Sequence, residues 1–245
     1  MKFQSKFNYT IILFFCSAAL LASGEELLIS HAASGNLEGV MEAIKAGSNV
    51  NTKDENKETP LMHASRNGHL AVARALIENS ADVNLKSANG ETSLFIAAAN
   101  GHQGITQLLF ESGASLESKT DFKMTPLMAA CEFGHIDIVR YLIEKGADMN
   151  VKDKYDYTAI SMASAGNYIE IVNLLIEKGA DINVRSKHGD TPLMIAAMTG
   201  NFDVALSLIE AGAGIHEKNK KGKTALEYAS SQGHSEVVKL LNAKK

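Results

Sequence analysis

From residue 25 onward the chain repeats every 33 residues without an insertion, and this period limits its fold more than any other feature. The units begin at residues 25, 58, 91, 124, 157, 190 and 223, and the last one ends after 23 residues. Units that recur at a fixed period of roughly 20 to 50 residues stack on their neighbours into elongated arrays. The sequence therefore predicts one repeat domain over residues 25–245 in place of a globule.

Each unit carries the signals of two short helices. In the second unit Thr59 can cap a helix and Pro60 suits its first position. Leu61 and Ala64 then share one helical face, and small residues at the seventh and eighth places let neighbouring helices approach closely. Gly68 ends the helix at a place that favours a left-handed backbone. A second apolar helix follows before the chain turns toward the next Thr.

The fifth unit has Asn167 at the place of Gly68, and Asn is the usual substitute for Gly in a left-handed conformation. The first unit opens with Glu26-Leu27 in place of Thr-Pro. Atypical end units are expected, because they cap the stack.

Units such as MTPLMAACEFGHIDIVRYLIEKGADMNVKDKYD, residues 124–156, resemble ankyrin repeats, and the resemblance covers residues 25–245. It implies an all-α fold: a curved solenoid of stacked antiparallel helix pairs with projecting hairpin loops. It also implies that the chain binds proteins on its concave face, through loop tips and first helices, and has no chemistry of its own.

One departure from the family pattern concerns the residue after Thr-Pro-Leu, usually a His that ties adjacent loops together. Here that place holds Met62, Phe95, Met128, Ser161, Met194 and Glu227. We therefore expect loops that are less stiffly held, with methionines available to adapt at a binding surface.

The first 24 residues have the pattern of a secretory signal peptide. Lys2 and Lys6 precede an apolar stretch over residues 11–22, and small residues lead to a predicted cleavage site near Gly24. Twelve apolar residues are short against the roughly 20 that span a bilayer, although an uncleaved anchor remains an alternative. We expect an exported protein, periplasmic if bacterial and otherwise secreted, with no stable membrane span after cleavage.

Composition excludes some partners and bonds. The net charge of −4 gives no basic surface for nucleic acid in general. Cys16 lies in the signal peptide, so Cys131 is the one cysteine of the repeat domain and no internal disulfide can form. Cys131 occupies the eighth place of its unit, which favours a small core residue; a reactive thiol is the alternative.

Catalysis requires groups that converge, and equivalent residues of stacked units lie about 8–10 Å apart. One equivalent place holds a histidine ladder: His69, His102, His135 and His234. We expect each of these rings to order the Gly-His turn, because ladder neighbours cannot easily share one zinc ion. The other histidines are scattered and support no joint site: His31, His63, His188 and His216. Recurring acids lie at exposed turns: Asp82, Asp148 and Asp181. We predict no catalytic residue, metal or cofactor, and no enzyme activity.

A basic ladder runs along the loop arms: Lys53, Lys86, Lys119, Lys152, Arg185 and Lys218. A solvated charge row is the simpler interpretation, and a contact with an acidic partner is the alternative.

Structural places repeat and binding places vary, so the central units carry the best functional signal. Aromatic residues and methionines gather where loop tips and first helices should face the groove: Phe122, Met124, Phe133, Tyr155, Tyr157, Tyr168 and Met198. Aromatic anchors within a charged rim suit a protein-binding site. The alternative is that these rings pack on adjacent loops and replace the missing His.

These observations predict an exported interaction scaffold, a monomer, that binds a protein of unknown identity on its concave face. Two alternatives remain open. One is an accessory or stress-protection factor that docks to a periplasmic enzyme, and the other is an effector secreted into host cells.

Overall fold

The computed structural model describes residues 24–244, and all secondary structure within that range is helical. The predicted signal peptide lies outside the described residues except for Gly24, where the first described helix begins. Among the described residues, no helix has the length and apolar character that crossing a bilayer requires.

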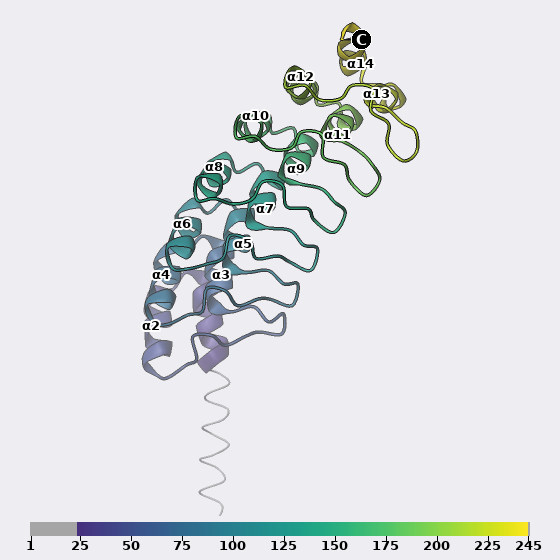
Figure 1. Ribbon diagram of the computed structural model, residues 1–245. Helices are drawn as coiled ribbons and strands as arrows, with labels where there is room; N and C mark the ends of the chain where they lie inside the picture. The colour runs from purple at the N-terminus through teal and green to yellow at the C-terminus, as the bar shows by residue number, and fades with distance from the viewer. Residues whose placement is uncertain (1–23, 245) are drawn as a thin grey trace, which may run out of the picture.

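Thirteen labelled helices follow an unlabelled one over residues 24–34 and complete seven stacked pairs (Figure 1). The helices that complete units one to four are α2 (Leu37–Lys45), α3 (Pro60–Asn67), α4 (Leu70–Glu78), α5 (Ser93–Ala99), α6 (Gln103–Glu111), α7 (Pro126–Glu132) and α8 (Ile136–Glu144). The helices of units five to seven are α9 (Ala159–Ala165), α10 (Ile169–Glu177), α11 (Pro192–Thr199), α12 (Phe202–Glu210), α13 (Ala225–Gln232) and α14 (Ser235–Ala243).

The predicted caps set where the first helices begin. The Thr59 hydroxyl accepts a hydrogen bond from the Met62 backbone N–H, and Thr92, Thr125, Thr191 and Thr224 make the same bond in their own units. Thr158 caps without this bond. The left-handed place is confirmed as well, since φ is 78° at Gly68 and 60° at Asn167.

Two layers of helices bury two clusters of apolar side chains, one in each half of the stack, and the partly buried Leu116 packs against both. The first helices form the inner layer and the second helices the outer layer, and the stack curves so that the loops lie on the inner side of the bend (Figure 1). The alanines at the seventh place are wholly buried in units two to seven. Cys131 is also wholly buried, and burial raises the pKa of its thiol far above the ordinary range. The expectation of a small core residue is confirmed.

Backbone hydrogen bonds join the tips of successive loops. At five successive junctions the backbone N–H of one tip donates to a carbonyl of the tip before it, over 2.8–3.0 Å. The donors are Ala88, Asp121, Lys154, Lys187 and Lys220, and the acceptors are Asn56, Asn89, Phe122, Tyr155 and His188. The expectation of less stiffly held loops left these bonds out of account, because they need no particular side chain.

The methionines after Thr-Pro-Leu also have a different role from the one expected. Met62, Met128 and Met194 are at most 1% exposed, so they cannot adapt at a binding surface. The Met62 sulfur instead accepts a hydrogen bond of 3.4 Å from the Thr59 backbone N–H, which completes the cap of α3. They are core and capping residues.

Candidate functional site

The seven residues predicted to bind a partner fall into two groups, one at the loop tips and one at the turns between first and second helices. The tip group, from the hairpin loops, comprises Phe122, Met124, Tyr155 and Tyr157. The turn group, where first helices end, comprises Phe133, Tyr168 and Met198. A seven-residue first helix separates the two groups by about 10 Å. The two groups therefore lie at opposite ends of the first helices.

In the tip group, Phe122 and Tyr155 project into solvent, with exposed fractions of 51% and 45%. The Lys154 ammonium lies 5.2 Å from the centre of the Phe122 ring, within reach of a cation–π contact. Met124 and Tyr157 are half-buried. Their own loop positions Tyr155 and Tyr157, because both backbone N–H groups donate to the buried Asp153 carboxylate over 2.7 and 2.8 Å. The two tyrosine rings are therefore carried by a loop backbone that these hydrogen bonds hold in place.

The turn group combines two exposed residues with one that packs between units. Phe133 is 54% exposed and Met198 is 41% exposed. The Tyr168 ring is half-buried against Gly134 and Gly166, where an added Cβ would lie within 2.4 Å of its ring atoms. A shallow hollow beside this ring is lined by Gly134, Ile136, Asn167 and Ile169. Tyr168 thus contributes to packing and to a surface recess at once.

Glu132 adds a carboxylate next to Phe133. Burial, together with the Asp153 carboxylate, raises the pKa of Glu132 above its ordinary value. A carboxylate that is costly to ionise in the free protein would gain from a cationic group on a partner.

The histidine ladder ties each unit to the one before it. The Nε2 atoms of His69, His102, His135 and His234 lie 3.0–3.1 Å from carbonyl oxygens near the end of the preceding first helix. Each ring also lies over the left-handed glycine of the preceding unit, where a Cβ would clash with it. The structural role is confirmed, but the bond joins two units instead of closing one turn.

The basic ladder is partly used within the fold. The ammonium groups of Lys53 and Lys86 donate to the carbonyls of Lys86 and Lys119, over 3.5 and 2.7 Å. Arg185 donates to the Lys218 carbonyl and pairs with Glu217 over 2.6 Å. These three side chains connect successive loop arms. They are therefore neither free in solvent nor fully available to an acidic partner.

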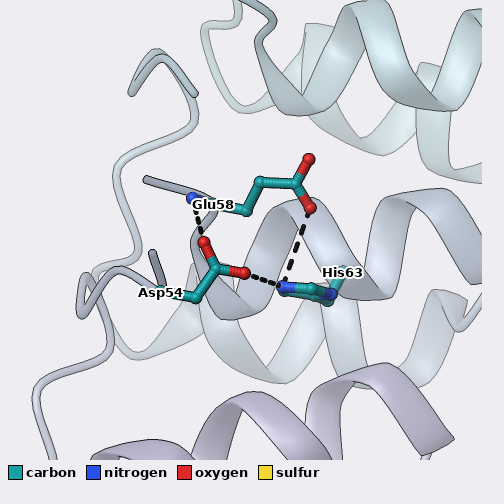
Figure 2. A group of neighbouring side chains, drawn as sticks. All are labelled: Asp54, Glu58 and His63. Carbon is teal, nitrogen blue, oxygen red and sulfur yellow. Dashed lines mark hydrogen bonds and ion pairs between the residues drawn. The ribbon is translucent and has the colours of Figure 1, made fainter. Parts of the chain in front are cut away.

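One group of ionisable side chains contradicts the expectation that the remaining histidines support no joint site. His63 on α3 meets Asp54 and Glu58 from the loop before it, as Figure 2 shows. The His63 Nε2 atom lies 2.9 Å from Asp54 Oδ2 and 3.7 Å from Glu58 Oε2. Ligand atoms of the three residues lie within 4.8 Å of one another, so the group could hold a metal ion.

The surroundings of these three side chains explain them equally well as an ion-pair cluster. The Arg66 guanidinium pairs with Glu58, and Asp54 Oδ1 accepts the backbone N–H groups of Asn56 and Glu58 over 2.9 and 2.8 Å. Burial opposes ionisation of Asp54, but these hydrogen bonds and His63 outweigh it and keep the Asp54 pKa below its ordinary value. The cluster fastens the first loop to its helix.

The same contact recurs at the far end of the stack, which is the signal that the sequence analysis missed. Asp54 precedes His63 by nine residues, and Asn219 precedes Tyr228 by the same offset. The Asn219 amide donates to the Tyr228 hydroxyl over 2.8 Å, and that hydroxyl lies 3.1 Å from Asp190 Oδ1. Comparing this pair of places across units would have found both contacts.

A second missed feature lies on the outer layer. The rings of Phe110 on α6 and Tyr141 on α8 meet edge to face at 6.1 Å, and the Lys145 ammonium lies within 6 Å of both centres. Such contacts stabilise the junction of units three and four.

Comparisons with known proteins match this geometry. A family profile described as ankyrin repeats, in three copies, matches residues 28–120, 114–186 and 182–245. The crystal structure of the human ASB11 ankyrin repeat domain is similar, with a TM-score of 0.80 and 30% sequence identity over 89% of this chain and 97% of that chain. A comparison with curated proteins finds no match. Because 640 solved chains match, the likeness identifies no single partner.

Proposed function

The chain belongs to the ankyrin repeat family, and on that premise we propose that it holds a protein partner on the concave face of its solenoid. Ankyrin repeats indicate a protein–protein interaction scaffold, and in general this fold is non-enzymatic. The finer proposal is that the partner contacts the tip group and the turn group of the central units.

The observation that carries this proposal is the exposure of four large apolar side chains at the loop tips and first-helix ends of units three to six. Phe122, Phe133, Tyr155 and Met198 are each more than two-fifths exposed, and they lie at loop tips or at the ends of first helices. Large apolar side chains are costly to leave in water, and aromatic anchors dominate the energetics of protein interfaces. An ordered backbone beneath them reduces the entropy lost on binding.

The test is partner capture by residues 25–245, followed by identification of the captured protein and measurement of its affinity. We expect Phe133→Ala and Tyr157→Ala to weaken the identified complex by about 1–3 kcal/mol each, the usual range for an interface anchor. We also expect the melting temperature of the free protein to change little with Phe133→Ala, since that side chain is 54% exposed.

A matched control is Phe202→Ala, which removes a 38% exposed aromatic ring at the start of α12 in the outer layer. Its complex should retain the affinity of the unchanged protein. If Phe133→Ala and Tyr157→Ala lower the melting temperature strongly while capture persists, the rings are packing elements and the proposed site is wrong.

Export is a second proposal, and it rests on the residue pattern of the first 24 positions. The destination would be the periplasm of a bacterium, or otherwise the medium. We expect a fusion of residues 1–40 to a reporter active only outside the cytoplasm to give signal, and Leu20→Arg in the apolar stretch to abolish it. Equal reporter activity without residues 1–24 would refute export.

A further inference from the structure

The hairpin tips form two exposed rows whose charge changes sign along the stack. The first row comprises Glu55, Ala88, Asp121, Lys154, Lys187 and Lys220, and the second comprises Asn56, Asn89, Phe122, Tyr155, His188 and Lys221. All twelve residues are exposed. Tip-to-tip backbone bonds hold consecutive tips in register, so the order of charges along the stack is fixed. Along the rows, one acid (Glu55) lies at the first tip, Asp121 and the two aromatic rings lie at the centre and the lysines at the other end, while the exposed Lys57 and Lys123 lie beside the two acids.

The basic end has no neutralising partners of its own. In the described part of the chain, Lys154, Lys187, Lys220 and Lys221 form no ion pair with an acid. The last tip adds Lys223, whose ammonium lies 5.4 Å from the centre of the Tyr228 ring. Four unpaired lysines on three consecutive tips create a positive potential that an acidic partner would relieve.

We propose that the occupant of these rows is an extended segment of the partner protein with an acidic half, an apolar centre and a basic end. The acidic half lies along Lys154, Lys187 and Lys220, the apolar residues contact Phe122 and Tyr155, and the basic end meets Glu55. This inference rests on the proposed function, because it names the chemistry of the partner at the same concave face.

Unit spacing sets the length of that segment. Successive helix pairs advance by about 8–10 Å, so five steps from the first tip to the sixth cover about 40–50 Å. An extended chain advances about 3.3 Å per residue, which gives a segment of about 12–15 residues. About three residues of the segment therefore correspond to one tip.

Two other occupants fit the charges less well. A second copy in antiparallel orientation would place Glu55 and Asp121 against lysines. The rows of each copy hold only these two acids but four lysines, so two lysines of each copy would find no acid on the rows of the other. Single-stranded nucleic acid would suit the lysines and rings, yet Glu55 and Asp121 would repel its phosphates. An acidic peptide with a basic end satisfies the whole pattern.

The test uses residues 25–245 and two fluorescent 15-residue peptides of identical composition. One has lysines, leucines and glutamates in three separate blocks, and the other has the same residues interleaved. We expect the blocked peptide to bind with a Kd lower by about tenfold, as about three exposed ion pairs would give. The difference should shrink as salt rises.

A variant pair assigns the contact to the tips. Lys187→Glu/Lys220→Glu/Lys221→Glu should remove the preference for the blocked peptide. Lys45→Glu/Arg74→Glu/Arg140→Glu makes the same charge change at exposed places on the outer helices and should leave it intact.

Equal affinity for the two peptides, or no binding of either, would overturn the inference. So would a dimer in light scattering that the tip variant dissociates, or preferential binding of oligothymidylate. If the peptides fail but Phe133→Ala still weakens the captured complex, the proposed function stands and only the charge pattern is wrong. If capture is also insensitive to Phe133→Ala, both proposals fail.

Discussion

At the scale of single residues, each side chain can be compared with the residues at the same place in the other units. Residues that differ from these equivalents point to local differences in stability. Ser65 and Ser164 stand at the eighth place, where the other five units have Ala32, Ala98, Cys131, Ala197 and Ser230. Their hydroxyls are buried and have no hydrogen-bond partner among the described residues. A buried hydroxyl without a partner costs free energy, because water would otherwise bond to it.

We therefore expect Ser65→Ala and Ser164→Ala each to raise the free energy of unfolding by about 1 kcal/mol. Urea unfolding followed by circular dichroism measures the change. Ser87→Ala is the control of opposite sign, because the Ser87 hydroxyl accepts from the backbone N–H groups of Asn89 and Glu91. A loss of stability in Ser65→Ala would mean that the hydroxyl has a partner.

Asp54 should make stability depend on pH at the acidic end. Its folded pKa lies below the ordinary value of 3.8, so its contribution is present above that value and is lost as pH falls through the folded pKa. We expect Asp54→Asn to be less stable than the unchanged protein at neutral pH, and the difference to close as pH falls through the folded pKa of Asp54. Asn is the suitable replacement because Asn219 caps the equivalent loop. A gap that persists in acid would contradict this assignment.

Glu132 should show the opposite dependence. Burial and the Asp153 carboxylate raise its folded pKa, so its contribution is complete below its ordinary value of 4.5 and is lost as pH rises through the folded pKa. Glu132→Gln should therefore be more stable than the unchanged protein at neutral pH, with the advantage vanishing in acid. The measurement is the melting temperature of both proteins from acidic to neutral pH. If Glu132→Gln is more stable by the same amount at every pH, ionisation of Glu132 is not the cause.

At the scale of elements, junctions between units matter more than the interior of any one helix. The bonds from the Gly-His turns, the loop tips and the loop arms all join one unit to the next. Helices of seven to nine residues are too short to be stable alone, so their order depends on these contacts and on the shared core.

His102 offers the clearest test of a junction. Its Nε2 atom lies 3.0 Å from the Arg66 carbonyl oxygen, and its ring covers Gly68. We expect His102→Ala to lower the free energy of unfolding by about 1–3 kcal/mol, because the bond and the packing are lost together. His216→Ala changes an exposed histidine and should have little effect. Equal losses from the two variants would show that the ladder does not hold the units together.

Much of the element level followed from the sequence. The Thr caps, the left-handed Gly68 and Asn167, and the buried Cys131 all rest on local rules that the period repeats. The stiffness of the loops did not follow, because backbone bonds between tips leave no mark in the side chains. The meeting of His63 with Asp54 and Glu58 did not follow either, because it joins a loop to a helix through residues that differ from unit to unit.

At the scale of the whole molecule, each unit is buried by its neighbours, so the end units protect the stack. Helices α13 and α14 supply Ala225, Ala229, Val237 and Leu241 to the core cluster that includes Leu193 and Val204. Their outer face is polar, with Glu227, Ser230 and Lys239 exposed.

Removing residues 223–245 should therefore lower the urea midpoint of residues 25–222 and increase the binding of a hydrophobic dye, because α11 and α12 lose their cover. Circular dichroism should still report helix in the remaining units. An unchanged midpoint would mean that the seventh unit adds no stability to the stack.

The tip-to-tip bonds have a consequence for how such a chain can change in length. Each bond joins the backbone N–H at the thirty-first place of one unit to the carbonyl at the thirty-second place of the unit before it, and it depends on no side chain. An in-frame duplication or loss of 33 codons would therefore leave every remaining junction with a partner of the right kind. The chain could therefore gain or lose whole units of 33 residues without losing the bonds between tips. Only the side chains at the tip of an added unit would then have to suit the partner.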